Sequence, residues 1–130
     1  MLKELGISEL IKFAKDEEFS GYDMAVRPGY PVNPHNVATA LPEAAKRFRD
    51  EGLDIPMVTG DTGVLLPNSE GERLVASMAD ADIRKLKLGY FKFVPTEMDY
   101  WVEVEKAREA LGGWQELSKQ YGVKICYHTH

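Results

Sequence analysis

The sequence is short of cysteine and has no long apolar run. Cys126 is the single cysteine among 130 residues, so the chain has no internal disulfide and no pair of thiols for a metal. We expect Cys126 to pack as a small hydrophobic side chain in a strand. No apolar run approaches the roughly 18 residues of a membrane-spanning helix, and Lys3 and Glu4 interrupt the basic-then-apolar order of a signal peptide. The sequence therefore predicts a cytoplasmic protein with no membrane partner.

Positive charge is also scarce. The chain has 16 Lys and Arg against 21 Asp and Glu, which gives a net charge of −5. Sequence-independent binding to nucleic acid requires clustered Lys and Arg to neutralise phosphates. We therefore expect no nucleic-acid partner, although a local basic groove is compatible with this composition. With 44% hydrophobic and 28% charged residues, the composition is that of one globular domain.

Helical and extended patterns alternate along the chain. The helical segments begin at Ser8, near Pro42, at a capping box formed by Ser69 and Glu72, and at Thr96 with Asp99. The extended segments are Tyr22–Arg27, Ile55–Thr59, Lys85–Phe93 and the run from Val123 to His130. The last helix has an apolar stripe from Trp101 through Trp114 to Tyr121, which predicts packing on the sheet, and its Gly112-Gly113 pair predicts a kink or a tight helix contact.

Strands that start roughly every thirty-odd residues, with a helix between each pair, predict a parallel sheet with right-handed crossovers. Two α/β folds are compatible with this order. A doubly wound sheet usually has a glycine-rich phosphate turn after a strand, and none of these strands is followed by one. A (β/α)₈ barrel requires about 250 residues, which is about twice the length of this chain.

Particular residues favour the barrel. The segments 21–29 (GYDMAVRPG), 34–37 (PHNV), 41–45 with 55–59, and 88–93 (LGYFKF) together resemble the sugar phosphate isomerase/epimerase family of xylose isomerase-like TIM barrels. The resemblance covers the chain from the first helix of such a barrel to its fifth strand. It implies a single domain over residues 1–130 that is a partial (β/α)₈ TIM barrel, with about four βα units, without the first strand and the C-terminal half.

The resemblance also implies a function. Family members move a proton at the carbon next to a sugar carbonyl, commonly with a divalent metal, so the expected partner is a sugar or sugar phosphate and the expected cofactor is Mn, Zn, Mg or Co. Most of the family's metal ligands and acidic residues have no counterpart here, so the isolated chain is expected to be inactive. Two alternatives remain open: an endonuclease-like barrel acting at abasic DNA sites, and a non-catalytic half-barrel. The exposed sheet edges of a half-barrel predict self-association.

Two histidines stand at the end of the last predicted strand. His128 and His130 are two residues apart, so on a strand both point to the same face, where imidazoles are suited to bind zinc, manganese or a similar ion. Two ligands are too few for a closed site. His128 takes the place at which many family members have a metal-binding glutamate. Polar lining or a hydrogen-bonded core position explains the pair equally simply.

Three further side chains are candidate substrate ligands. Arg27, at the carboxyl end of a strand, is suited to bind a phosphate or a sugar oxygen, or to form an ion pair with Asp23 or Asp61. Lys92 is placed to contact an anionic substrate, or to extend into solvent. Asp61 is placed to orient a sugar hydroxyl, or to form a turn with its neighbouring glycines. His35, in the loop after residues 22–27, is expected at the surface.

Overall fold

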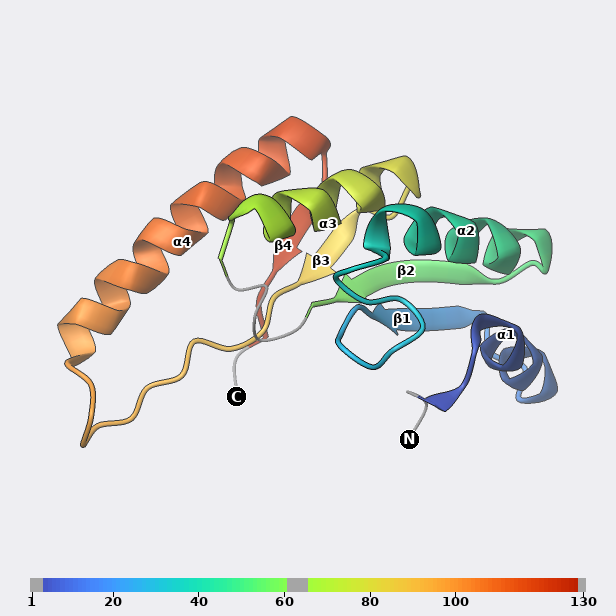
Figure 1. The fold of residues 1–130 in the computed structure, drawn as a ribbon, viewed down its shortest axis with the longest axis horizontal. Helices are drawn as coiled ribbons and strands as arrows, with labels where there is room; N and C mark the ends of the chain where they lie inside the picture. The colour runs from blue at the N-terminus through green and yellow to red at the C-terminus, as the bar shows by residue number, and fades with distance from the viewer. Residues whose placement is uncertain (1–3, 61–65, 129–130) are drawn as a thin grey trace.

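The computed structural model describes residues 4–60 and 66–128. Within them, helices and strands alternate in the order expected from the sequence, as Figure 1 shows. The helices are α1 (Ile7–Asp16), α2 (Val37–Asp50), α3 (Ser69–Asp80) and α4 (Tyr100–Tyr121). The strands are β1 (Gly21–Ala25), β2 (Asp54–Thr59), β3 (Lys85–Lys87) and β4 (Lys124–Cys126).

The strands form one parallel sheet in the order β1-β2-β3-β4. Helices α2, α3 and α4 lie over one face of this sheet, and α1 lies beside the edge strand β1 (Figure 1). The strands lie side by side in the order in which they occur in the chain, as expected for successive βαβ crossovers. The predicted parallel α/β architecture is confirmed.

The core lies between the sheet and the helices that cover it. One register row of the sheet, formed by Met24, Val58, Leu86 and Ile125, belongs to this core. Trp114 of α4 and Phe48 of α2 are the largest side chains that are wholly buried against it. Each fully buried side chain of this size stabilises the fold by about 1.5–3 kcal/mol relative to exposure. The apolar faces of the helices therefore determine which face of the sheet is covered.

The next register row faces the other way. Ala25, Thr59, Lys87 and Cys126 are neighbours across the four strands. Because successive residues of a strand point to opposite faces, this row lies on the face away from the core row. In the described part of the chain no helix covers that face (Figure 1). We call it the open face of the sheet.

Strand lengths differ from the sequence expectation. Strand β3 ends at Lys87 instead of continuing to Phe93, and β4 ends at Cys126. Among the described residues, the last ladder hydrogen bonds of β3 join the Gly60 N–H to the Lys87 carbonyl (3.0 Å) and the Leu88 N–H to the Cys126 carbonyl (2.9 Å). An apolar, β-prone sequence such as residues 88–93 forms a strand only where a neighbouring backbone is available.

Helix starts differ as well. Ser8 was expected to cap α1, but Gly6 is the N-cap and its N–H donates to Glu9 Oε2 at 2.7 Å, while Ser8 Oγ accepts from Arg47. Helix α2 begins at Val37, so Pro42 lies inside it and not at its first turn. The cap of α3 is Asn68, one residue before the expected Ser69.

The long helix α4 packs over only part of its predicted stripe. Trp114 is buried, as expected, but Trp101 is 72% exposed, because the first turns of α4 extend beyond the sheet (Figure 1). Gly113 makes the expected tight contact, since a Cβ there would meet Pro67 Cγ at 2.4 Å. Among the described residues, no helix is both long and apolar enough to cross a membrane.

Candidate functional site

Backbone hydrogen bonds hold the carboxyl ends of the strands side by side. Val26 N–H donates to the Thr59 carbonyl at 3.0 Å, just beyond the end of β1. The Gly60 and Leu88 contacts given above continue the same ladder past β2 and β3. The residues that follow each strand therefore meet at one edge of the sheet. In parallel α/β proteins this is the edge at which ligands bind.

A hollow of about 160 Å³ opens at this edge. We call it the carboxyl-end hollow, and it is lined by Arg27, Thr59, Gly60, Lys87, Leu88, Gly89 and Tyr90. Its walls come from the ends of three adjacent strands. Gly60 and Gly89 contribute only backbone to this lining. The hollow has room for a small ligand group, since one water requires only ~10–15 Å³ of such volume.

Arg27 was predicted as a substrate ligand, and the structure places it in the wall of this hollow. Its side chain is half-buried, and its Nε is buried with no hydrogen-bond partner. Of the two alternative ion pairs for Arg27, the one with Asp23 is not formed, and the one with Asp61 lies outside the described residues. Asp23 instead accepts from Thr59 Oγ1, with distances of 2.7 and 2.8 Å to its two carboxylate oxygens.

The pair of Asp23 and Thr59 spans β1 and β2 on the open face. Thr59 is 7% exposed, whereas the Asp23 carboxylate is exposed. Because the threonine hydroxyl supplies its proton to the carboxylate, it has no proton left for a ligand, but its lone pairs remain. The Asp23 oxygens have further lone pairs that face solvent. The open face therefore presents an acceptor beside the two cations of the carboxyl-end hollow.

The other predicted site residues do not line the hollow. Lys92 is exposed in the irregular segment between β3 and α4. His35 is exposed, as expected, and its backbone N–H donates to Asn33 Oδ1 at 3.0 Å within the loop after β1. His128 is exposed just after β4. Asp61 and His130 lie outside the described residues, so their predicted roles stay predictions.

The described residues were also searched for a metal site. In residues 4–60 and 66–128, no group of three or more His, Cys, Asp or Glu side chains is close enough together to hold an ion. His128 alone does not meet the three or four ligands that zinc requires. The described side chains therefore do not form a metal centre, and metal binding by His128 with His130 remains a prediction.

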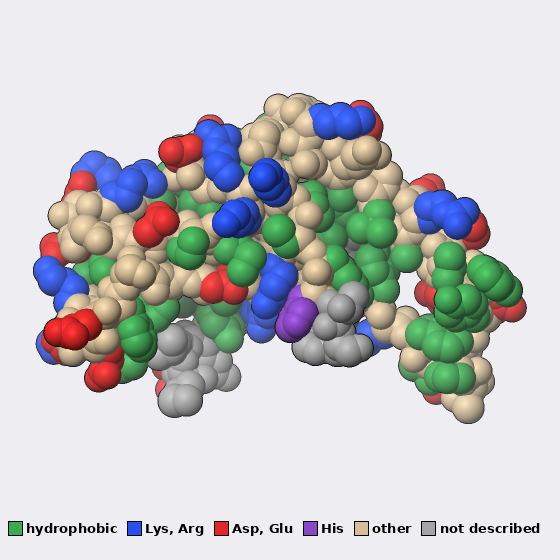
Figure 2. Space-filling model, turned by 180° about the vertical axis from the view of Figure 1, so that it is seen from behind, with side chains coloured by type: hydrophobic (Ala, Val, Ile, Leu, Met, Phe, Trp, Pro, Cys, Tyr) green, Lys and Arg blue, Asp and Glu red, His purple; other side chains and the backbone are tan. Residues whose placement is uncertain are grey.

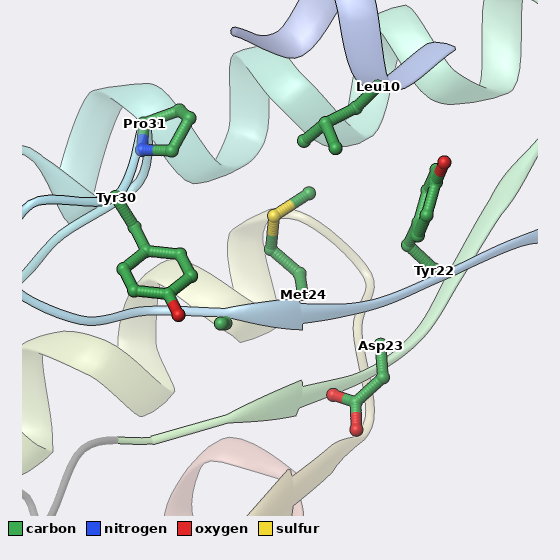
Figure 3. Close-up of a pocket in the computed structure, with 7 residues that line it drawn as sticks. Leu10, Tyr22, Asp23, Met24, Tyr30 and Pro31 are labelled. Carbon is green, nitrogen blue, oxygen red and sulfur yellow. The ribbon is translucent and has the colours of Figure 1, made fainter. Parts of the chain in front are cut away.

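A second hollow, of about 270 Å³, lies along the free edge of β1. We call it the β1-edge hollow, and it is lined by Leu10, Tyr22, Asp23, Met24, Ala25, Tyr30 and Pro31. Figure 3 shows Tyr22 and Met24 on the side of β1 that faces Leu10, and Asp23 on the opposite side. Apart from Asp23 and the tyrosine hydroxyls, its lining is apolar. This lining is suited to a hydrophobic side chain or a neighbouring strand, and not to a sugar.

Exposed aromatic side chains gather where α4 begins. Figure 2 shows hydrophobic side chains at that end of the molecule, at the lower right of the view. Tyr100 contacts Phe93 at a ring-centroid distance of 5.6 Å and Trp101 at 5.1 Å. A separate contact ties the segment before α4 to β4, because Phe91 N–H donates to the Tyr127 hydroxyl at 3.2 Å. The irregular segment is therefore held at both ends.

Comparison with known proteins matches the fold but not the sequence. No protein-family model matches the chain, and no curated protein matches it in sequence. Among solved structures, a D-psicose 3-epimerase crystallised in the presence of D-fructose matches 90% of this chain with a TM-score of 0.60 and 15% identity. The chain folds as part of a TIM barrel. The match covers 44% of the epimerase chain, so this chain spans less than half of that protein's length.

Of the residues that line the carboxyl-end hollow, the sequence predicted Arg27 as a site residue and did not predict the others. Arg27 was identified because it stands at the carboxyl end of a predicted strand, Tyr22–Arg27. Lys87 was missed because the expected strand continued to Phe93, which placed Lys87 in the middle of a strand. The strand boundary was the missing information, since it depends on where β2 and β4 end. The Asp23–Thr59 hydrogen bond was missed because it depends on the register between β1 and β2.

Proposed function

We propose that this chain is part of a sugar isomerase or epimerase-like enzyme, which moves a proton at the carbon next to a sugar carbonyl. The observation that carries the proposal is the carboxyl-end hollow, a polar hollow built by three adjacent parallel strands at the edge where barrel enzymes bind substrates. The structural likeness to a D-psicose 3-epimerase supports the choice of reaction class, and at 15% identity that support is an analogy of fold.

The proposed roles follow from the chemistry of the side chains. Isomerisation and epimerisation both need a base near the carbon that loses its proton and donors near the carbonyl oxygen, where negative charge develops. Arg27 and Lys87 are the cationic donors in the carboxyl-end hollow. Asp23 is the carboxylate on the open face beside them, and Thr59 fixes its orientation. We assign Asp23 to the binding of sugar hydroxyls or to the proton-accepting role.

The test is proton exchange with solvent. The 130-residue chain is incubated in D₂O with ketohexoses and with ketose phosphates, and deuterium incorporation next to the carbonyl is followed by NMR. The isolated chain is expected to be inactive in the complete reaction, but because Asp23 lies beside the two cations of the hollow, we expect the partial reaction, proton exchange, at a rate above that of the buffer alone. Asp23→Asn is expected to lower the rate by at least tenfold. Asp80→Asn, an exposed aspartate of α3, is the matched control and should leave the rate unchanged.

A uniform background rate for every sugar would contradict the proposal. Each assay is run with EDTA and with added Mn²⁺, Co²⁺, Mg²⁺ or Zn²⁺, because the family resemblance implies a metal. The predicted role of His128 is measured separately by metal titration. We expect His128→Ala to weaken metal binding, and equal affinity of the two proteins would remove His128 from the metal site.

A further inference from the structure

We propose that the exposed aromatic side chains at the start of α4 form a docking surface for an arginine-containing polypeptide segment. We call this surface the aromatic patch, and it consists of Phe93, Tyr100, Trp101 and Val102. None of these side chains lines the carboxyl-end hollow, so the inference concerns a partner and goes beyond the proposed function. Three observations support it: the exposure of the patch, the arrangement of its rings, and the carboxylates beside it.

The first observation is the exposure of contiguous aromatic side chains. Trp101 is 72% exposed, Tyr100 55% and Phe93 43%. Single exposed apolar side chains are ordinary, but these three are in contact, because Tyr100 packs against the rings of both others. Figure 1 shows the first turns of α4 beyond the ends of the strands. Contiguous apolar surface bordered by polar residues is typical of protein interaction sites, in which Trp and Tyr supply much of the binding energy.

Hydrogen bonds hold the backbone of the patch in one arrangement. The Val94 carbonyl accepts from the Glu97 N–H at 3.0 Å, which closes the turn before α4. The Asp99 carboxylate caps the helix and accepts from the N–H groups of Trp101 and Val102 at 2.9 and 3.1 Å. A partner therefore binds without first ordering this backbone, and this lowers the entropic cost of association.

The second observation is the arrangement of the rings. Tyr100 lies edge-to-face with Phe93 at an interplanar angle of 83° and with Trp101 at 75°. Rings that are nearly perpendicular do not form one flat platform, on which successive nucleic-acid bases would stack. They present separate ring faces, and a guanidinium is attracted to the negative face of a single ring. The arrangement therefore favours a cation of side-chain size over a nucleic acid.

The third observation is the negative charge beside the aromatic patch. Residues 93–105 contain four Asp and Glu and no Lys or Arg, and Figure 2 shows acidic side chains beside the hydrophobic ones at this end of the molecule. Two of the four, Glu103 and Glu105, form ion pairs with basic residues three positions further along α4. Among the described residues, the other two, Glu97 and Asp99, form no ion pair. Their charge outweighs the roughly +0.5 charge of the helix N-terminus, so this end of α4 attracts cations.

Ring faces and carboxylates together select the partner. An arginine side chain combines a planar cation, which stacks on an aromatic face, with a fork of donors that matches a carboxylate. A negatively charged lipid surface would be repelled by Glu97 and Asp99. A wholly apolar partner would bury these carboxylates without a counter-ion, which is costly. A polypeptide segment in which arginine alternates with apolar residues satisfies both requirements.

The experiment titrates the 130-residue chain with defined probes. A short peptide of alternating arginine and leucine is compared with a glutamate and leucine peptide of the same length, and with vesicles of phosphatidylcholine and phosphatidylserine. ¹⁵N NMR follows the indole N–H of Trp101, and the indole of the buried Trp114 is the internal reference. We expect the arginine peptide to bind about tenfold more tightly than the glutamate peptide, with a difference that shrinks as salt is added. The signal of Trp101 should shift, and that of Trp114 should not.

Variants assign the binding to the aromatic patch. Trp101→Ala should weaken the arginine peptide about tenfold. Trp101→Leu retains an apolar side chain but loses the ring face, and should weaken it about two- to fivefold. Glu97→Gln should weaken it by a similar factor at low salt. The controls are Leu111→Ala and Glu116→Gln, two exposed positions further along α4, which should leave the affinity unchanged.

Folding is checked by circular dichroism, and the exposure of Trp101 means that its replacement leaves the core intact. Failure of the arginine peptide to bind, equal affinity for the two peptides, or equal losses in Trp101→Ala and Leu111→Ala would overturn the proposal. Binding of the vesicles in place of the peptide would identify a membrane surface and overturn it as well. If no peptide binds and Trp101→Ala reduces self-association of the chain, the occupant is a second copy and the proposal fails.

Discussion

At the scale of single residues, the Tyr121 side chain forms a hydrogen bond between α4 and α3. Its hydroxyl donates to Glu72 Oε1 at 2.9 Å. This hydrogen bond, followed by burial and by the negative charge of Glu72, raises the pKa of Tyr121 above its ordinary value of 10.0. The protonated phenol is the form that the carboxylate stabilises, because ionisation would remove the donor and place two negative charges together.

We expect Glu72→Gln to lower the pKa of Tyr121 towards its ordinary value. The pKa is measured by NMR titration of tyrosine labelled with ¹³C at Cζ. Glu70→Gln is the control, since Glu70 is exposed on the first turn of α3, whereas the Tyr121 hydroxyl donates to Glu72. Equal shifts in the two variants would show that the hydrogen bond is not the cause.

The direction of the pH effect on stability follows from the same shift. A pKa that is higher in the folded chain than in the unfolded chain means that folding favours the protonated form. The contribution of Tyr121 to the free energy of unfolding is therefore complete below pH about 10. It is lost as the pH rises through the raised pKa of the folded state.

At the scale of elements, α3 has two candidate N-cap residues, Asn68 and Ser69. The sequence favoured Ser69, because Glu72 follows it at capping-box spacing, but the Asn68 side chain accepts from the N–H groups of Glu70 and Gly71, both at 3.1 Å. Both residues are good caps by type. The choice depends on which residue has the extended backbone of an N-cap, and that residue is Asn68 (φ −92°, ψ −170°).

We predict that Asn68→Ala lowers the free energy of unfolding by about 1 kcal/mol. Ser69→Ala, inside the helix, should change it by only a few tenths of a kcal/mol or raise it slightly, because alanine is the better helix former. Urea denaturation followed by circular dichroism measures both. A larger loss for Ser69→Ala than for Asn68→Ala would restore the cap expected from the sequence.

The glycine pair of α4 provides a matched test of packing. A Cβ at Gly112 would meet nothing within 4 Å, whereas one at Gly113 would meet Pro67 Cγ at 2.4 Å and Cβ at 3.0 Å. Both substitutions to alanine gain about 1 kcal/mol of helix propensity. Only Gly113→Ala also incurs an overpacking cost, of about 1–3 kcal/mol, because the proline ring has little freedom to move.

We therefore expect Gly112→Ala to stabilise the chain by about 1 kcal/mol, and Gly113→Ala to be less stable than Gly112→Ala by about 1–3 kcal/mol. Thermal and urea unfolding of the two variants measure this difference. Equal stabilisation by both would mean that the segment before α3 moves away from α4 at little cost.

Local patterns predicted the elements better than they predicted their boundaries. The alternation of helix and strand was readable because each element follows its own apolar period. The end of β3 at Lys87 could not be predicted, since residues 88–93 continue to favour a strand. In the structure β3 ends where its pairing with β2 and β4 ends. The same limit applies to the carboxyl-end hollow. Arg27 was predicted from its position at the end of a strand. Lys87 lies in the hollow because β3 pairs with β2 in a register that places Lys87 beside Thr59.

At the scale of the whole molecule, the described sheet has a strand on only one side of β1 and of β4. Both edges lie beside apolar hollows. The β1-edge hollow contains Met24 and Leu10. A hollow of about 270 Å³ beside β4 is lined by Leu111, Trp114, Gln115, Ser118, Ile125 and Tyr127. Unpaired strand edges bordered by apolar surface favour pairing with another chain.

The direction of the strands makes the two edges complementary. All four strands are parallel, so β4 of one copy is able to extend the sheet of another copy beyond β1 with every strand still parallel. Two copies would supply eight strands, the number in a closed TIM barrel. In that arrangement the apolar hollows of both edges would be filled, and the open faces of the two sheets would enclose one interior.

We therefore predict that the 130-residue chain self-associates in a concentration-dependent way, which sedimentation velocity measures. Leu111→Glu should weaken the association, because Leu111 is 43% exposed beside β4 and its loss leaves the core intact. Gln120→Glu adds the same charge to an exposed position of the same helix, away from this hollow, and should leave the association unchanged. A folded monomer at every concentration would rule out edge pairing, and equal weakening by both variants would show that net charge, not the β4 edge, governs the association. A discrete dimer that is lost in Leu111→Glu alone would favour closure by two copies over open-ended aggregation, since closure leaves no free edge for a third chain.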